Sequence, residues 1–171
     1  MKSALALLGM FWSLLPAVAG AGDLKALDAE NGFRDARFGT SLDTLDGLQL
    51  LTESGAAGTQ LYIRPDESLE IGAARLDGVT YGFYRERLYF VAIFTSGQRN
   101  TEAVLARFQE AYGPGAAVAG DAVEFVWQGS RVLLHFRQDP ATGVGMAALT
   151  SLPMDAQVKS ASAAVPADAE P

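Results

Sequence analysis

Short segments of apolar or alternating residues, separated by glycine-containing turns, make up most of the chain between Gly32 and Ser151. Such alternation is typical of strands that bury one face. Only residues 101–112 repeat apolar side chains clearly at helical spacing, with Asn100 as a cap before them and Gly113-Pro114 as a stop after them. Because no strand is followed by a long crossover helix in regular alternation, a parallel sheet is not expected. The pattern predicts an α+β fold, with an antiparallel sheet of about seven to nine strands and two helices packed on one face.

The turns place the other expected elements. A short helix is expected to open at Thr40-Ser41, whose hydroxyls can cap it, and to end at Gly47. Asp77-Gly78 is a hairpin signal, and a further turn is expected at Arg85-Glu86 because residues 79–94 are too long for one strand. The segments expected to form strands are residues 32–38, 48–53, 59–64, 69–75, 79–84, 87–95, 123–127, 132–136 and 144–151.

Aromatic residues are concentrated in the two strands at 79–95. The side chains expected to face the helices are Val79, Tyr81, Phe83, Leu88, Phe90 and Phe94, and those expected on the opposite face are Tyr84, Tyr89, Val91 and Ile93. An antiparallel sheet often keeps one face polar, whereas this second face is partly apolar. Another strand, the leader or the tail could cover it, and a register slip of one residue would exchange the two faces.

The first residues of the chain predict export. Lys2 is the only charge in residues 1–21, an apolar run follows from Ala4 to Leu15, and small residues end the segment. This order is that of a secretory signal peptide, with cleavage after Ala19 or Ala21. The apolar run is shorter than the roughly 20 residues of a membrane-spanning helix, although an uncleaved anchor is the alternative. The sequence therefore predicts a periplasmic or secreted protein without a stable membrane anchor.

Composition and charge narrow the possible functions. The chain has no cysteine, which excludes disulfides, a thiol nucleophile and the lipid-carrying cysteine of a lipoprotein. Its net charge of −7 disfavours nucleic acid and anionic membranes as partners. After the signal peptide at 1–21, we expect a leader at 22–31, a single α+β domain at 32–152 and a disordered tail at 153–171, which is rich in alanine, serine and proline.

Candidate catalytic groups are sparse. His135 is the only histidine and is expected to be a surface or half-buried strand residue, because spacing places no partner beside it. The serines considered are Ser41, Ser96 and Ser130, all expected in caps or turns. The neighbouring carboxylates are Asp43 with Asp46, Asp66 and Glu67 with Glu70, and Asp121 with Glu124; all are expected on solvated surface. No metal site and no cofactor site is expected, since neither a calcium loop nor a nucleotide-binding loop is present.

Several strings carry a family resemblance. They are GFRDARFGTS, LYIRPDESLEIGAARLDGVTYGFYRERLYFVAIFTSG, YGPG and EFVW. Over roughly residues 32–151 the chain resembles a group of uncharacterised exported bacterial proteins. More distantly, it is similar to the β-lactamase-inhibitor-like fold, which the small lipoproteins of outer-membrane assembly share, although the lipoprotein cysteine is missing here. The resemblance implies protein binding through a sheet.

The hypothesis drawn from the sequence is a non-catalytic, exported module that binds another envelope protein through an aromatic sheet face. The residues expected to form this site are Tyr62, Tyr81, Tyr84 and Tyr89, with Tyr81 placed on the helix-covered side by the expected register. One alternative is a carrier of a small lipophilic ligand in a cavity between sheet and helices. A second is a small hydrolase that uses His135 or a carboxylate.

Overall fold

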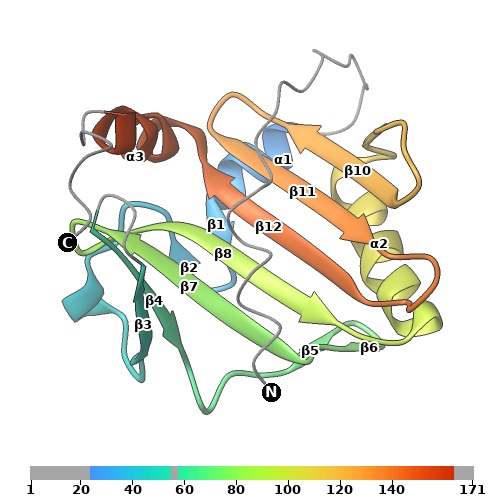
Figure 1. Cartoon of the computed structure of the whole chain (residues 1–171), viewed down its shortest axis with the longest axis horizontal. Coiled ribbons are helices and arrows are strands. Elements are labelled where there is room, and N and C mark those ends of the chain that lie inside the picture. Colours follow the sequence, from blue (N-terminus) through green and yellow to red (C-terminus); the bar gives the residue numbers. More distant parts are fainter. Residues whose placement is uncertain (1–23, 55–57, 164–171) are drawn as a thin grey trace.

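An eight-stranded antiparallel sheet forms the centre of the molecule, with the strand order β3-β4-β7-β8-β12-β11-β10-β9 (Figure 1). The computed structural model describes residues 24–54 and 58–163, so the predicted signal peptide lies outside the described residues. The strands are β3 (Gln49–Ser54), β4 (Thr59–Ile63), β7 (Gly78–Tyr84), β8 (Arg87–Thr95), β9 (Ala116–Ala117), β10 (Val123–Gln128), β11 (Val132–Gln138) and β12 (Gly145–Ser151). The predicted α+β class and antiparallel sheet are confirmed.

Two small hairpins lie outside this sheet. They are β1 (Gly32–Phe33) with β2 (Ala36–Arg37), and β5 (Glu70–Ile71) with β6 (Ala74–Arg75). Each was expected as a single strand, and the chain reverses in them at positive φ, at Arg34 and at Gly72. The hairpin expected at Asp77-Gly78 is wrong, because β6 pairs with β5 while β7 pairs with β4 and β8. The turn expected at Arg85-Glu86 is confirmed, and both residues have positive φ.

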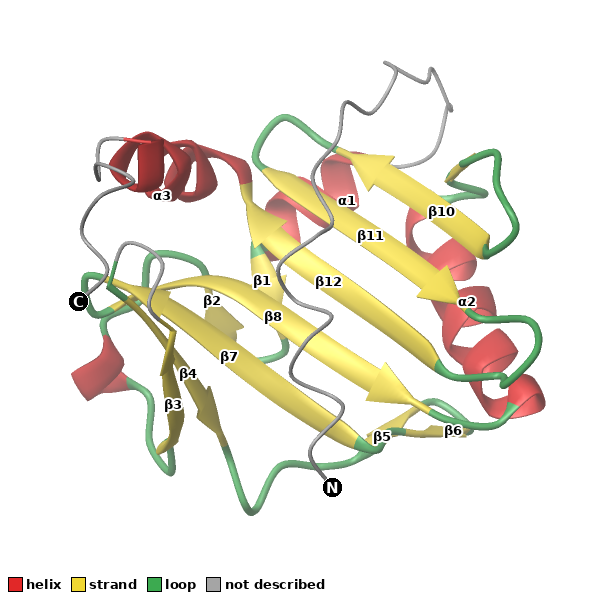
Figure 2. Ribbon diagram, viewed as in Figure 1, coloured by secondary structure: helices red, strands yellow, loops and turns green. Residues whose placement is uncertain are grey.

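Helix α2 (Gln98–Tyr112) packs on one face of the sheet, here called the helix-covered face (Figure 2). Its buried side chains are Thr101, Val104, Phe108 and Tyr112, which confirms the predicted apolar stripe. The helix begins earlier than expected, with Gly97 rather than Asn100 as its N-cap. Asn100 instead holds the backbone of Arg75, whose N–H donates to Asn100 Oδ1 over 2.7 Å and whose carbonyl accepts from Asn100 Nδ2.

The second helix on this side is α1 (Leu24–Glu30), formed by residues expected to be a leader. Leu27 is only 1% exposed and belongs to the hydrophobic core, and the Tyr112 hydroxyl donates to the Glu30 carboxylate. The short helix expected from Thr40 to Gly47 is reduced to one 3-10 turn at Leu42–Thr44, and the Ser41 side chain does not cap it. Two helices on one face were expected and are found, but residues 24–30 form the second helix, not residues 40–47.

A β-bulge in β8 decides which side chains reach the core. Phe83 pairs with Leu88 and Gly82 pairs with Phe90, so Tyr89 is an extra residue in β8. Beyond it the alternation is inverted: Val91 and Ile93 are completely buried on the helix-covered face, whereas Phe90 and Phe94 lie on the second face. The predicted faces of these four residues are thus wrong. Those of Val79, Tyr81, Phe83 and Leu88 are confirmed.

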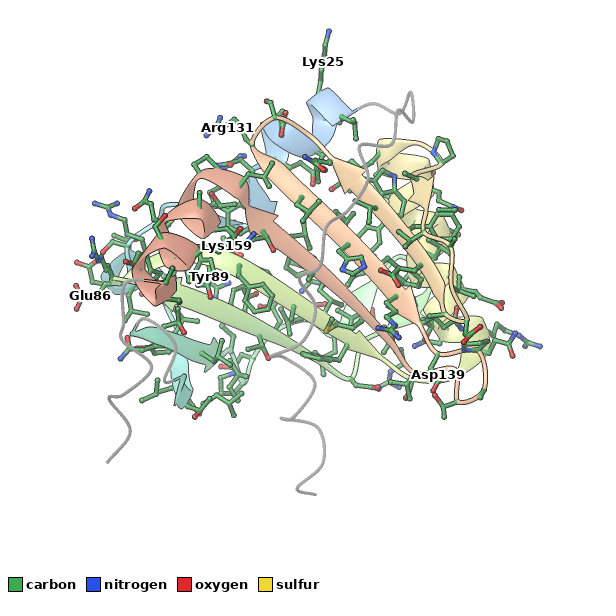
Figure 3. The ribbon with its side chains drawn as sticks, turned by 45° about the horizontal axis from the view of Figure 1, so that its top comes forward. Lys25, Glu86, Tyr89, Arg131, Asp139 and Lys159 are labelled. Carbon is green, nitrogen blue, oxygen red and sulfur yellow. The ribbon has the colours of Figure 1, made fainter. Side chains whose placement is uncertain are left out.

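Residues 152–163 form helix α3 (Leu152–Ala163), so the prediction of disorder from Pro153 is wrong for this part of the tail. The Leu152 N–H donates to the Arg131 carbonyl over 2.8 Å, and Asp155 is 8% exposed. Figure 3 shows α3 near the labelled Tyr89, at one end of the sheet. Residues 164–171 lie outside the described residues.

None of the helices formed by the described residues is long and apolar enough to cross a membrane.

Candidate functional site

Two of the four predicted tyrosines belong to the helix-covered side. Tyr81 is completely buried in the hydrophobic core, and its hydroxyl donates to Glu67. Tyr62 pairs with Tyr81 across the strands and packs edge-on against Phe83, with 5.2 Å between the ring centroids. Tyr81 therefore contributes to stability and offers no surface to a partner.

The other two predicted tyrosines lie on either side of the β7–β8 turn, Tyr84 at the end of β7 and Tyr89 in β8. Tyr84 is only 3% exposed, so the prediction that it offers an exposed surface for binding is wrong. Tyr89 is half-buried and hydrogen-bonded to the Thr59 side chain. Burial, with a smaller effect from the Asp155 carboxylate, raises the pKa of Tyr89 to about 12. The structure does not bring the four tyrosines together on one surface.

Phenylalanine residues instead mark the second face of the sheet. Phe94 pairs with Met146, and Phe90 pairs with Thr150, across the boundary between β8 and β12. A Cβ on residue 82 would lie 2.5 Å from Phe90 Cδ1, so the Phe90 ring covers the space that Gly82 leaves. The second-face patch is defined here as Phe90, Phe94, Met146 and Ala148, all half-buried. Sequence alternation misses the two phenylalanines because nothing in it signals the bulge at Tyr89.

His135 lies beside the second-face patch. It pairs across the strands with Ala148, and its Nε2 lies 2.6 Å from Glu124 Oε1. The predicted half-buried position is confirmed, and Glu124 is the partner that spacing did not place. Two of the candidate serines lie away from His135. Ser130 donates to Asp28 at the β10–β11 turn, and Ser96 donates to Asp77.

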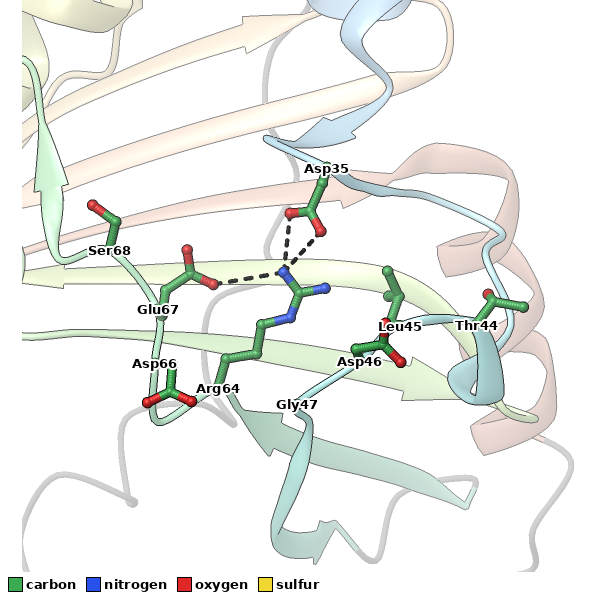
Figure 4. Close-up of a pocket in the computed structure, with 9 residues that line it drawn as sticks. All are labelled: Asp35, Thr44, Leu45, Asp46, Gly47, Arg64, Asp66, Glu67 and Ser68. Atoms are coloured by element: carbon green, nitrogen blue, oxygen red, sulfur yellow. Dashed lines mark hydrogen bonds and ion pairs between the residues drawn. The ribbon is translucent and has the colours of Figure 1, made fainter.

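A polar pocket lies apart from this patch, beside β4 (Figure 4). Its volume is about 330 Å³, and it is lined by Asp35, Thr44, Leu45, Asp46, Gly47, Arg64, Asp66, Glu67 and Ser68. Arg64 Nη1 donates to both carboxylate oxygens of Asp35, over 2.9 and 3.0 Å, and lies 3.9 Å from Glu67 Oε2. The hydrogen bond from Arg64 holds the pKa of Asp35 below its usual value, despite some desolvation.

Glu67 connects this pocket to the core. Its side chain is 8% exposed and accepts hydrogen bonds from Arg34 Nη1 and the Tyr81 hydroxyl. Burial, followed by the hydrogen bond to Glu67, raises the pKa of Tyr81 well above its usual value. Glu67 was expected on solvated surface. That prediction is wrong, because Arg34 and Tyr81 approach it from distant segments.

The described residues contain no group of three histidine or acidic side chains that could hold a metal ion. In comparisons with protein-family models, curated proteins and solved structures, the chain matches none. The family resemblance found in the sequence therefore stays a prediction.

Proposed function

We propose that the protein is an exported, non-catalytic binding module that engages another envelope protein through the second-face patch. The observation that supports this function is the apolar character of a sheet face on which, among the described residues, α3 is the only helix and lies at one end (Figure 1). Phe90, Phe94 and Met146 gather on this face, where a solvated antiparallel sheet usually carries polar residues. Aromatic residues and methionine are enriched in protein interfaces.

The chemistry of the partner follows from the surroundings of the patch. Its contact surface would be apolar at the centre, to cover Phe94 and Met146. The chain carries 20 acidic and 13 basic side chains, so a partner with a basic rim is electrostatically favoured. Charged groups of both signs border the patch, because Arg137 pairs with Met146 on one side and with Glu124 on the other, and Glu124 also binds His135. The proposed partner is therefore an exported protein whose contact surface is apolar at the centre and carries more basic than acidic groups around it.

The two alternatives find less support. A lipophilic carrier needs an apolar cavity between sheet and helices, but the core side chains Phe108, Trp127 and Phe136 pack together in that layer. The 330 Å³ pocket is polar and is lined by loops. A hydrolase would need a nucleophile beside the His135–Glu124 pair, and the candidate serines Ser96 and Ser130 instead bind Asp77 and Asp28 in other parts of the fold.

The test compares two matched double substitutions. A partner is first identified by crosslinking in the native compartment and then purified. Binding is measured for the wild type, for Phe94→Ser with Met146→Ser, and for Leu50→Ser with Leu51→Ser. The leucines are about half exposed and lie on β3, at the far edge of the sheet.

The proposal predicts that the patch variant loses binding and that the leucine variant retains it. Ala148→Glu provides a second patch variant, which inserts a charge without removing a large side chain. Thermal unfolding shows whether each variant is folded. Loss of binding by the leucine variant alone, or unchanged binding by folded Ala148→Glu, would contradict the proposal.

A further inference from the structure

The charges around the Arg64 pocket are only partly paired. Asp35 is paired with Arg64, and Glu67 is held by Arg34 and the Tyr81 hydroxyl. Asp46 and Asp66 also line the pocket, and both are exposed. Neither forms a hydrogen bond or ion pair with any other residue that the structure describes. The pocket therefore presents two open carboxylates.

One terminal nitrogen of Arg64 is unused. Asp35 and Glu67 both approach Nη1, while Nε is fully buried and has no hydrogen-bond partner among the described residues. In Figure 4, all dashed lines from Arg64 meet one terminal nitrogen, and the other terminal nitrogen points toward the side of Leu45 and Asp46. Because Nε is closed off from solvent, a ligand in the pocket can reach this guanidinium only at Nη2. A carboxylate accepts a charge-assisted hydrogen bond from such an N–H group.

Arg34 holds in place the segment 67–70 that forms one side of the pocket. Arg34 Nη1 donates to the Ser68 carbonyl and Nη2 to the Glu70 carbonyl, both over 2.6 Å. The same guanidinium binds Glu67, and the Arg64 guanidinium lies 5.3 Å from the centre of the Tyr81 ring. A site that is ordered before binding loses less entropy when a ligand arrives.

We infer that the Arg64 pocket binds a free basic amino acid. The ligand carboxylate would accept a hydrogen bond from Arg64 Nη2, and the ammonium groups of the ligand would approach Asp46 and Asp66. A ligand with only a carboxylate would face the uncompensated acidic groups, and a ligand with only amines would leave Arg64 Nη2 without a partner. The volume of about 330 Å³ lies at the small end of the range of ligand pockets.

This inference is independent of the proposed function. None of the pocket residues belongs to the second-face patch, so either proposal can fail without the other. The probes are L-lysine and cadaverine, which is the same diamine without the carboxylate. Binding of each is measured by titration calorimetry to the mature protein, to Arg64→Gln and to Asp66→Asn. The control is Arg107→Gln, because Arg107 lies on α2 and is half exposed.

The expected result is saturable binding of L-lysine at millimolar concentration, with cadaverine at least tenfold weaker. In Arg64→Gln, L-lysine binding falls to the level of cadaverine, while cadaverine binding is little changed. In Asp66→Asn, both probes weaken together, and Arg107→Gln leaves both unchanged. This pattern separates recognition from a general loss of structure, because unfolding would affect both probes alike.

Two results would overturn the inference. One is the absence of saturable L-lysine binding to the wild-type protein. The other is equal affinity for L-lysine and cadaverine, which would leave Arg64 without a role in recognition. Asp66→Asn keeps the test decisive if Arg64→Gln does not fold, because Asp66 is exposed and forms no contact that the fold requires.

Discussion

Asp28 provides the most direct test of how α1 joins the domain. Its Oδ2 accepts hydrogen bonds from the Ser130 N–H and hydroxyl, both over 2.7 Å. Its Oδ1 accepts from the N–H groups of Arg131 and Val132, over 2.8 and 3.0 Å. One carboxylate thus connects α1 to the β10–β11 turn, more than a hundred residues later in the chain.

Replacing this carboxylate removes four hydrogen bonds. A hydrogen bond to a charged group contributes roughly 1.5–3 kcal/mol, but the site is partly hydrated and water would replace some of the lost partners. We therefore expect Asp28→Ala to lower the free energy of unfolding by about 2–4 kcal/mol. The free energy of unfolding of Asp28→Asn should lie between those of the wild type and Asp28→Ala. The asparagine amide keeps one acceptor oxygen but directs its NH₂ donor toward other N–H donors.

The pH dependence follows from the pKa of Asp28. Desolvation raises this pKa, but the hydrogen bonds from Ser130, Arg131 and Val132 together outweigh it, so the pKa is lowered in the folded protein. The stabilisation is therefore present above the unfolded pKa of about 3.9 and is lost as the pH falls through the folded value. The difference between wild type and Asp28→Ala should shrink below about pH 4.

Urea unfolding, followed by circular dichroism, measures these differences. Asp121→Ala is the matched control, because Asp121 is exposed, and its change should stay within about 0.5 kcal/mol. If Asp28→Ala changed the free energy of unfolding no more than this control, the docking of α1 would be refuted. A difference in the free energy of unfolding between wild type and Asp28→Ala that grew as the pH fell would also refute this role of the Asp28 carboxylate.

Three other predictions concern the core, the second face and export. Phe108→Ala should cost about 3–5 kcal/mol, since Phe108 is 6% exposed and packs between Tyr112 and Trp127; calorimetric unfolding that showed only a small loss would mean that the α2 stripe does not face the core. Tyr84→Ser should strongly lower the melting temperature because Tyr84 is buried, whereas Arg85→Ser at the adjacent exposed turn should not; equal melting temperatures would refute the burial of Tyr84. Intact mass spectrometry of the exported protein should find a mature chain that begins at Gly20 or Gly22, and a chain that still begins at Met1 would contradict the signal peptide.

The sequence allowed the fold class to be predicted because strand alternation and turn residues are local properties. Gly113 lies after the α2 stripe, where the end of a helix favours glycine. The turn at Arg85-Glu86 was predictable from the length of residues 79–94, although neither residue type favours the positive φ that both adopt. The bulge at Tyr89 is different. It depends on the Phe90 ring occupying the space above Gly82 on the neighbouring strand, and a single extra residue then exchanges the faces of Val91 and Phe94.

The missed parts depend on contacts between distant segments. Helix α1 is short, and Leu27 packs into the core where Asp28 and Glu30 connect the helix to the β10–β11 turn and to Tyr112. Asp35 and Arg64 are 29 residues apart, and the intervening loops bring them together. No local pattern marks such a pair. The candidate pocket could therefore not be predicted from spacing alone.

Photocrosslinking in the native compartment tests whether the second-face patch is the binding surface, with a photoreactive residue placed once at position 146 and once at position 107 on α2. A discrete crosslinked partner is expected from position 146. It should be absent from position 107 and be lost when Phe94→Ser is added. The same partner captured equally from both positions, or from position 107 only, would contradict this role of the patch.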